Sequence, residues 1–189
     1  MLSAEHEKSL VARQTDTLEK VAYGELLASI ADHLCRRVET IAPGVICSVL
    51  AADRNARLRT LAGPSLPEQY SRAIDGTLIG PDVGCCGSAA YRGIAVEITD
   101  IECNPHFDNY RSYLLPLGLK ACWSSPTKAR DGRVVGTFAF YFSSQRGPTD
   151  VEREVVERCT HLCSLAIEHD EIQRRMHELA FVDPLSGSA

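Results

Sequence analysis

The sequence predicts an α+β domain in which an antiparallel sheet is covered by helices, and three observations support this prediction. Apolar residues recur at helical spacing at both ends of the chain, while short strand-like runs lie between them. The pair Asp131-Gly132 separates two of these runs, as in a tight hairpin. Strands and helices do not alternate regularly, which favours an antiparallel sheet over a parallel one. With 189 residues, 44% of them apolar, the chain suffices for one domain and a helical extension.

A long amphipathic helix is predicted over residues 5–42. This segment has no proline and a single glycine, and its apolar side chains lie three and four positions apart. Pro43-Gly44 ends the helix. Runs 45–50 and 57–61 then flank a polar turn, and this pattern predicts two paired strands.

The middle of the chain combines short helices with loops. Pro67 suits the first turn of a short helix. Glycine and proline mark a loop over 76–84, and the small residues of 85–91 form a helix that Gly93 stops. A strand is expected over 94–98, and a helix over 107–117 that is interrupted near Pro116.

The last elements are a hairpin and a second long helix. Runs 119–126 and 134–143 flank the Asp131-Gly132 turn and are expected to be central strands. Thr149 or Asp150 is the predicted N-cap of the helix that follows. Its apolar stripe continues to Leu179, beyond what one domain can cover, so the later turns are predicted to form a coiled coil.

Composition argues against several functional classes. The net charge is −5, and no Lys/Arg-rich block indicates nucleic-acid binding. The polar N-terminal segment contains no signal peptide and no apolar stretch that could span a membrane, so we expect a cytoplasmic protein. Hydrolase and phosphate-loop motifs are also absent.

The eight cysteines fall into two groups. One group lies in apolar periodic segments, where buried packing is expected: Cys35, Cys47, Cys159 and Cys163. The other group is less easily explained by packing alone: Cys85, Cys86, Cys103 and Cys122. Together with His106, these four could ligate iron or zinc or form a thiol redox pair, and the alternative is that they are packing thiols.

Four segments carry a resemblance to a known family. They are Gly-Cys-Cys-Gly-Ser-Ala-Ala at 84–90, Ile-Thr-Asp-Ile at 98–101, Gly-Leu-Lys-Ala-Cys-Trp-Ser-Ser-Pro at 118–126 and Gly-Thr-Phe-Ala-Phe-Tyr at 136–141. In this order they resemble the GAF domains of bacterial GGDEF and EAL signalling proteins. The tail Leu-Ala-Phe-Val-Asp-Pro-Leu-Ser-Gly at 179–187 is similar to the linker and opening of a GGDEF diguanylate cyclase domain.

The resemblance implies a regulatory module in three parts: a signalling helix over 1–24, a GAF sensor domain over 25–168, and a coiled-coil linker with the start of a GGDEF domain over 169–189. A GAF module of this kind detects a small-molecule, metal or redox signal and acts on its output domain through a homodimeric bundle of the N- and C-terminal helices. The chain itself is then not an enzyme. Two alternatives stay open: a haem- or iron-containing gas or redox sensor, and a GAF-fold reductase of free methionine sulfoxide.

The resemblance also implies where a ligand binds, between the sheet and the helices and loops over it. The ligand-binding residues it suggests are Cys86, Asp100, Phe107, Tyr110, Arg111, Cys122 and Ser124. The set suggested for a metal is Cys85, Cys86, Cys103, His106 and Cys122, and His106 is the histidine expected near the cavity. Asp100, Phe107 and Arg111 can equally serve as a turn cap, a core residue and a solvated charge.

Overall fold

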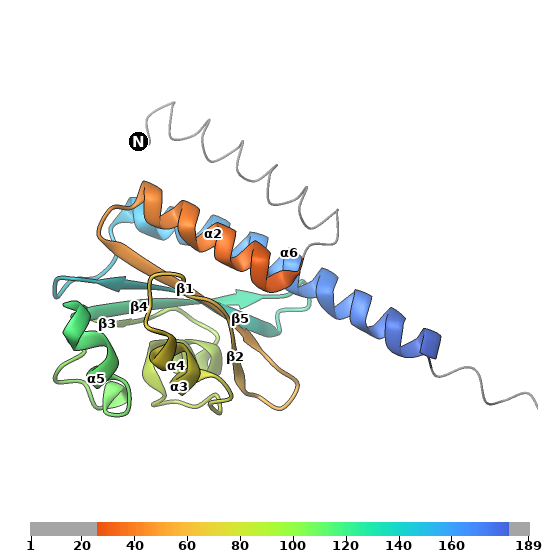
Figure 1. The fold of residues 1–189 in the computed structure, drawn as a ribbon, viewed down its shortest axis with the longest axis horizontal. Coiled ribbons are helices and arrows are strands. Elements are labelled where there is room, and N and C mark those ends of the chain that lie inside the picture. Colours follow the sequence, from red (N-terminus) through yellow and green to blue (C-terminus); the bar gives the residue numbers. More distant parts are fainter. Residues whose placement is uncertain (1–25, 182–189) are drawn as a thin grey trace, which may run out of the picture.

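The chain folds around one five-stranded sheet with helices on both faces. A computed structural model describes residues 26–181 (Figure 1). The strands lie in the order β2-β1-β5-β4-β3, and all neighbours are antiparallel. Their bounds are β1 Val45–Ala52, β2 Leu58–Ala62, β3 Val96–Ile98, β4 Ala121–Lys128 and β5 Val134–Phe142. The predicted α+β class and antiparallel sheet are confirmed.

The predicted hairpin forms the centre of the sheet. The backbone N–H of Ala129 donates to the carbonyl of Arg133 at 2.9 Å, which closes the turn between β4 and β5. Gly132 adopts φ 84°, a left-handed conformation that glycine reaches without steric cost. The Asp-Gly signal therefore located this turn correctly.

Two long helices cover one face of the sheet, α2 Leu27–Ile41 and α6 Asp150–Phe181 (Figure 1). Phe138, Phe140 and Phe142 project from β5 toward these helices, because alternate residues of a strand face the same side. The rings of Phe138 and Phe140 meet edge to face, with centroids 5.8 Å apart. One layer of the core thus binds the sheet to both helices.

A capping box begins α6. The Thr149 hydroxyl accepts from the backbone N–H of Glu152 at 3.2 Å, and the Glu152 carboxylate accepts from the N–H of Thr149 at 2.7 Å. Arg146 adds an ion pair to the same carboxylate at 2.7 Å. The predicted N-cap at Thr149 is confirmed.

The other face carries shorter elements: α3 Glu68–Ile74, α4 Gly84–Arg92, the 3₁₀ helix Pro105–Phe107, α5 Arg111–Leu114 and the 3₁₀ helix Leu115–Leu117. Of the predicted helix over 107–117, the interruption near Pro116 is confirmed, but α5 begins only at Arg111. Pro116 has no backbone N–H to continue α5, and the Asn104 side chain caps a separate 3₁₀ turn by accepting from the N–H of His106.

Two other predictions differ from the structure or lie outside it. Strand 94–98 is reduced to β3 Val96–Ile98, because Gly93 ends α4 in a left-handed conformation and Ile94 turns outward. The predicted signalling helix over 1–24 and the GGDEF-like end of the tail, 182–189, lie outside the described residues. No helix within 26–181 is both long and apolar enough to cross a bilayer.

Candidate functional site

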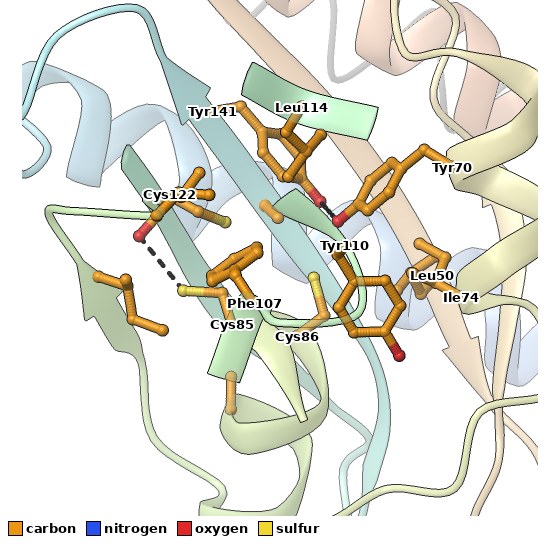
Figure 2. Close-up of a cluster of buried hydrophobic side chains, with 14 of the residues drawn as sticks. Leu50, Tyr70, Ile74, Cys85, Cys86, Phe107, Tyr110, Leu114, Cys122 and Tyr141 are labelled. Atoms are coloured by element: carbon orange, nitrogen blue, oxygen red, sulfur yellow. Dashed lines mark hydrogen bonds between the residues drawn. The ribbon is translucent and has the colours of Figure 1, made fainter. Parts of the chain in front are cut away.

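The candidate site lies between the sheet and α3, α4 and α5, on the face opposite α2 and α6 (Figure 2). Apolar and aromatic side chains from these elements enclose it, among them Phe107, Tyr110 and Leu114. Within this apolar shell the sheet presents a row of polar side chains. The site therefore has the composition of a small-ligand pocket, an apolar cavity with a few polar groups.

Strand register places these polar side chains side by side. Ala139 of β5 pairs with Ser48 of β1 on one side and with Ser124 of β4 on the other. Thr137 lies two residues before Ala139 and faces the same side. Ser48, Ser124 and Thr137 are all 1% exposed or less, so their hydroxyls lie deep in the protein.

Two tyrosines complete the polar row. The Tyr70 and Tyr141 hydroxyls are 2.9 Å apart and share a hydrogen bond, and Tyr141 lies 3.4 Å from the Ser48 hydroxyl (Figure 2). Their rings meet edge to face at 5.9 Å. Burial raises the pKa of both phenols well above the usual value, so both stay protonated and can donate hydrogen bonds.

The Cys86 thiol of α4 lies over this row. Burial raises the pKa of the Cys86 thiol to about 11, against the opposing influence of the Ser124, Thr137 and Tyr141 hydroxyls nearby. Cys86 is therefore an uncharged thiol at neutral pH. Apart from this contact with the Cys86 thiol, the Ser124 and Thr137 hydroxyls have no hydrogen-bond partner among the described residues.

In the same core, the Cys85 thiol is hydrogen-bonded to the backbone of Cys122. The Cys85 thiol donates to the carbonyls of Cys122 at 3.2 Å and Val96 at 3.3 Å (Figure 2). Burial and the adjacent Cys85 thiol raise the pKa of the Cys122 thiol. Because only a thiolate attacks or ligates efficiently, Cys122 is poorly suited to nucleophilic chemistry in this conformation.

A cavity of about 20 Å³ adjoins Cys86. Residues of β1, β2, α3, α4 and the loop between α3 and α4 line the cavity, together with the residue before α5. They are Leu50, Leu58, Tyr70, Ile74, Thr77, Val83, Gly84, Cys85, Cys86, Gly87 and Tyr110. This volume corresponds to about one water molecule. A larger ligand therefore requires the helices of this face to move outward.

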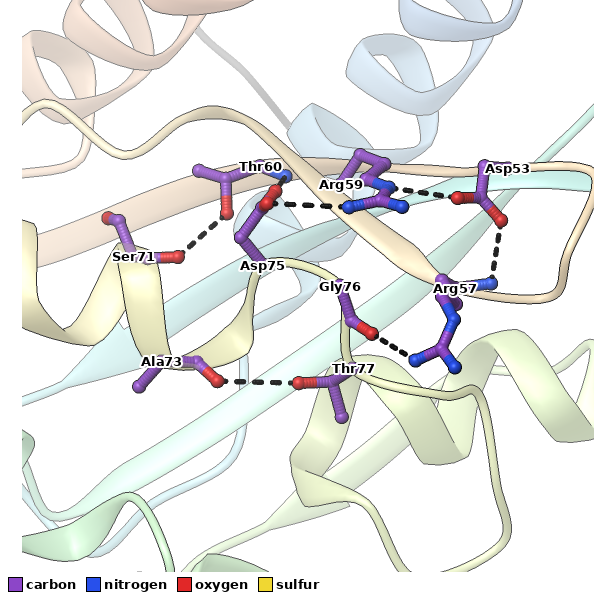
Figure 3. A network of polar contacts seen from close by, with 9 residues as sticks. All are labelled: Asp53, Arg57, Arg59, Thr60, Ser71, Ala73, Asp75, Gly76 and Thr77. Atoms are coloured by element: carbon purple, nitrogen blue, oxygen red, sulfur yellow. Dashed lines mark hydrogen bonds and ion pairs between the residues drawn. The ribbon is translucent and has the colours of Figure 1, made fainter.

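A polar network holds the cavity wall against the edge of the sheet (Figure 3). Arg57 donates to the carbonyl of Gly76 at 2.7 Å, and the Asp75 carboxylate accepts from the N–H of Thr60 at 2.8 Å. Arg59 joins Asp53 at 2.8 Å and Asp75 at 3.6 Å. The segment after α3 is thus tied to β2 by exposed contacts that a rearrangement can break at modest cost.

The structure brings five of the seven predicted ligand-binding residues into this buried core: Cys86, Phe107, Tyr110, Cys122 and Ser124. Asp100 instead accepts from the N–H of Cys103 at 3.1 Å, within its own loop. Arg111 pairs with Asp108 and donates to the carbonyl of Asn104 at 3.2 Å. Neither Asp100 nor Arg111 lines the cavity.

The structure brings together only three of the five predicted metal ligands, Cys85, Cys86 and Cys122. Cys85, Cys86 and Cys122 are buried, Cys103 is exposed, and the Nε2 atom of His106 lies 3.2 Å from an oxygen of Asp82. Within residues 26–181, no three histidine, cysteine or acidic side chains are arranged to hold a metal ion. Metal binding remains a prediction that this structure does not test.

Sequence reasoning missed Ser48, Tyr70, Thr137 and Tyr141. For Thr137 and Tyr141 a signal was present, since Thr137, Ala139 and Tyr141 alternate with three phenylalanines. Ser48 is a lone hydroxyl residue in the apolar run 45–50. Tyr70 gave no such signal. Its place in the site depends on how α3 packs, which a single sequence does not encode locally.

The protein has one five-stranded antiparallel sheet, with two long helices on one face and the candidate site on the other. It is therefore a single-sheet α+β domain. Residues 26–167 match the sequence model of the family described as GAF domain, and the chain belongs to that family. The predicted GAF fold is confirmed.

One sequence relative and two solved structures are similar to the chain. The chain is 34% identical over 163 residues to the methyl sulfide methyltransferase-associated sensor of Methanosarcina acetivorans, a match that covers 86% of the chain but 16% of that protein. It shares its fold with the GAF domain of an Acinetobacter phosphoenolpyruvate-protein phosphotransferase, at TM-score 0.67, 16% identity and coverage of 90% and 97%. It is also similar to the free methionine-R-sulfoxide reductase of Neisseria meningitidis, at TM-score 0.63, 15% identity and coverage of 85% and 89%.

Proposed function

We propose that this GAF domain is the cytoplasmic sensory part of a longer signalling protein. A small-molecule, metal or redox signal acts on the core beneath α4, and the change is passed through paired helices to a C-terminal diguanylate cyclase. The observation that carries the proposal is α6, which packs on the sheet and then continues past it (Figure 1), with an apolar stripe that no other residue of 26–181 buries.

The two parts of α6 have different surroundings. Val156, Cys159 and Leu162 are buried against the sheet and α2. Further along, Ile172, Met176 and Leu179 are 55%, 60% and 73% exposed. Their spacing of four and three matches the a and d positions of a heptad, and such a seam is stabilised by a second helix. A second copy of this chain supplies an identical seam, so the proposed pair is two α6 helices that run parallel.

Two observations support a separate output domain. The 179–187 segment resembles the entry to a GGDEF domain, and the chain spans 16% of the length of the curated relative it matches. A rigid helix that links the sensor to an output domain can adopt two arrangements. A ligand in the sensor and the state of the output domain can each shift the equilibrium between them.

Light scattering tests the pairing. The chain is expected to show twice its 20.7 kDa mass, and Ile172→Glu with Met176→Glu is expected to reduce it to one chain mass, because charges enter an apolar seam. The control is Gln173→Glu, which adds a charge beside the seam. A parent chain that stays monomeric at tens of micromolar contradicts the proposal.

The output domain is tested with GTP. A longer protein that includes this chain is expected to produce cyclic di-GMP, and the 189-residue chain alone is expected to produce none. The chain alone could instead form cyclic di-GMP at a rate that does not fall through successive purification steps. That result would contradict the proposal that sensor and cyclase are separate domains.

A second candidate is reduction of free methionine sulfoxide, favoured by the three thiols in the core and by the fold that the chain shares with such reductases. The neutral, buried state of Cys86 and Cys122 argues against it. A turnover assay with free methionine sulfoxide and a thiol reductant separates the candidates, since the sensor is expected to give no turnover.

The third candidate is a haem or iron sensor. A cavity of about 20 Å³ does not accommodate haem unless α3, α4 and α5 move outward, so the residues in this conformation do not fit that group. An absorption spectrum and metal analysis of freshly purified protein test this alternative. A haem band that persists through purification favours it over an organic signal.

A further inference from the structure

The wall of the cavity next to Cys86 reaches solvent at two residues. All the residues that line this cavity are buried except Thr77 and Val83, which are partly exposed. Thr77 lies in the segment that follows α3, and Val83 directly precedes α4. A molecule that enters the cavity from solvent therefore has its shortest path at one of these two residues.

The backbone around Thr77 is fixed to the edge of the sheet. The N–H of Leu58 donates to the carbonyl of Thr77 at 2.9 Å, and the N–H of Gly76 donates to the carbonyl of Leu58 at 2.7 Å. The Arg57 side chain adds a hydrogen bond to the carbonyl of Gly76 (Figure 3). An opening at Thr77 would break these backbone hydrogen bonds, and their groups would lose their partners.

Residues 80–83, which we call the entrance loop, are held by weaker contacts. In the described part of the chain, no backbone hydrogen bond joins the entrance loop to the sheet, to α3 or to α5. The carbonyl of Pro81 accepts from the Ser88 hydroxyl at 2.9 Å, and the exposed carboxylate of Asp82 lies 3.2 Å from Nε2 of His106. Exposed contacts of this kind contribute little to stability, so the entrance loop can leave its position at modest cost.

Val83 closes the wall by packing against a residue that has no side chain. A Cβ atom on Gly87 would lie 2.7 Å from the Cβ of Val83 and 2.9 Å from its Cγ1. Carbon atoms in contact are normally about 3.5–4.0 Å apart, so only glycine at position 87 leaves room for Val83. The Val83 side chain is thus seated on α4 and forms one end of the cavity wall.

We propose that the entrance loop is the gate of this cavity and that Val83 is the residue that closes it. When Val83 leaves its seat on Gly87, the cavity opens to solvent beside Cys86, while the backbone at Thr77 stays on β2. The gate serves the sensory function proposed above and rests on it for the role of the cavity. It adds the route by which a signal arrives and makes Cys86 the thiol that opening exposes.

Modification of thiols by iodoacetamide tests the gate on the full chain in the absence of any signal. Peptide mass spectrometry with fragmentation gives the rate at Cys86 relative to the rate at Cys159, which is buried in the other core. Val83→Ala removes two methyl groups from the closed gate and is expected to raise this ratio about fivefold. Asp82→Ala removes the exposed contact with His106 and is expected to raise it about threefold.

Thr77→Ala is the matched control. It truncates the other partly exposed residue of the wall and leaves the backbone hydrogen bonds of Thr77 in place. Because those bonds keep this part of the wall closed, Thr77→Ala is expected to change the ratio by less than about twofold.

Three results would overturn the proposal. They are an unchanged ratio in both Val83→Ala and Asp82→Ala, an equal rise in Thr77→Ala, and a rise at Cys159 that matches the rise at Cys86, which indicates opening of the whole domain. Should Val83→Ala fail to fold, as judged by circular dichroism, Asp82→Ala decides, since its side chain is exposed. Failure of the gate leaves the sensory function standing, because helix pairing and cyclase output are measured separately, by light scattering and with GTP.

Discussion

At the scale of single residues, the site combines groups that the sequence indicates with groups that only the fold brings in. Cys86, Cys122 and Ser124 were predicted, and they lie in the core. Asp100 and Arg111 were predicted too, yet their charges are used within their own loop. A motif can place a residue near a pocket, but side-chain direction depends on neighbours that are remote in sequence.

The shared hydrogen bond between Tyr70 and Tyr141 is expected to contribute to stability. Tyr70→Phe removes a buried donor and acceptor and is expected to lower the free energy of unfolding by about 1–2 kcal/mol in urea titrations. The matched control is Tyr91→Phe, at a tyrosine that is 61% exposed, with an expected change below about 0.5 kcal/mol. Equal effects of the two substitutions would show that the buried bond contributes nothing.

The eight thiols are expected to react at very different rates. Cys103 is exposed and the other seven are buried, and a buried thiol reacts only when the structure opens. Treatment of native protein with iodoacetamide at neutral pH is therefore expected to modify Cys103 first, as followed by peptide mass spectrometry. Modification of Cys86 or Cys122 at the same rate would show that the core beneath α4 is open in solution.

At the scale of elements, local signals predicted most of the helices and strands. The Asp131-Gly132 turn, the N-cap at Thr149 and the glycine that ends α4 each act through backbone geometry within a few residues, so the sequence shows them directly. The 107–117 segment is not one helix, because the 3₁₀ turn that Asn104 caps ends at Phe107 and Pro116 lies in a second 3₁₀ turn after α5. Its apolar spacing matched a helix although the backbone could not continue one.

The capping box of α6 is expected to make stability depend on pH. Burial alone would raise the pKa of Glu152, but Arg146 and the N–H of Thr149 outweigh it and hold the pKa below its ordinary value of 4.5. The stabilisation is then fully present above pH 4.5 and is lost as pH falls through the lower, folded-state pKa.

Glu152→Gln is expected to lower the free energy of unfolding by about 1 kcal/mol at pH 7. The difference between parent and variant should shrink as pH falls below 4.5, as measured by denaturant titration at several pH values. Glu157→Gln, at an exposed carboxylate on the same helix, serves as the control. A difference that stays constant down to the acid transition would contradict the role assigned to the Glu152 charge.

At the scale of the whole molecule, the sheet separates two cores with different tasks. One core lies under α3, α4 and α5 and contains Tyr70 and Tyr141, and the other joins the sheet to α2 and α6. Tyr141 and Phe140 are neighbours on β5 and belong to different cores, so a single strand separates the candidate site from the helix face. The sequence predicted the helices, the strands and the pairs β1–β2 and β4–β5, but not the pairing of β1 with β5, since pairing between distant strands leaves no local signal.

The central claim, that two copies pair in parallel along α6, is tested most directly by disulfide trapping. Ile172→Cys, Met176→Cys and Leu179→Cys are made separately in a Cys103→Ser background, with Gln173→Cys as the control beside the seam. In a parallel pair, equivalent seam residues face each other, so all three seam variants are expected to form a disulfide between copies under mild oxidation, far faster than Gln173→Cys. Trapping at no more than one of the three positions, as in an antiparallel crossing, or no preference over Gln173→Cys, would contradict the claim.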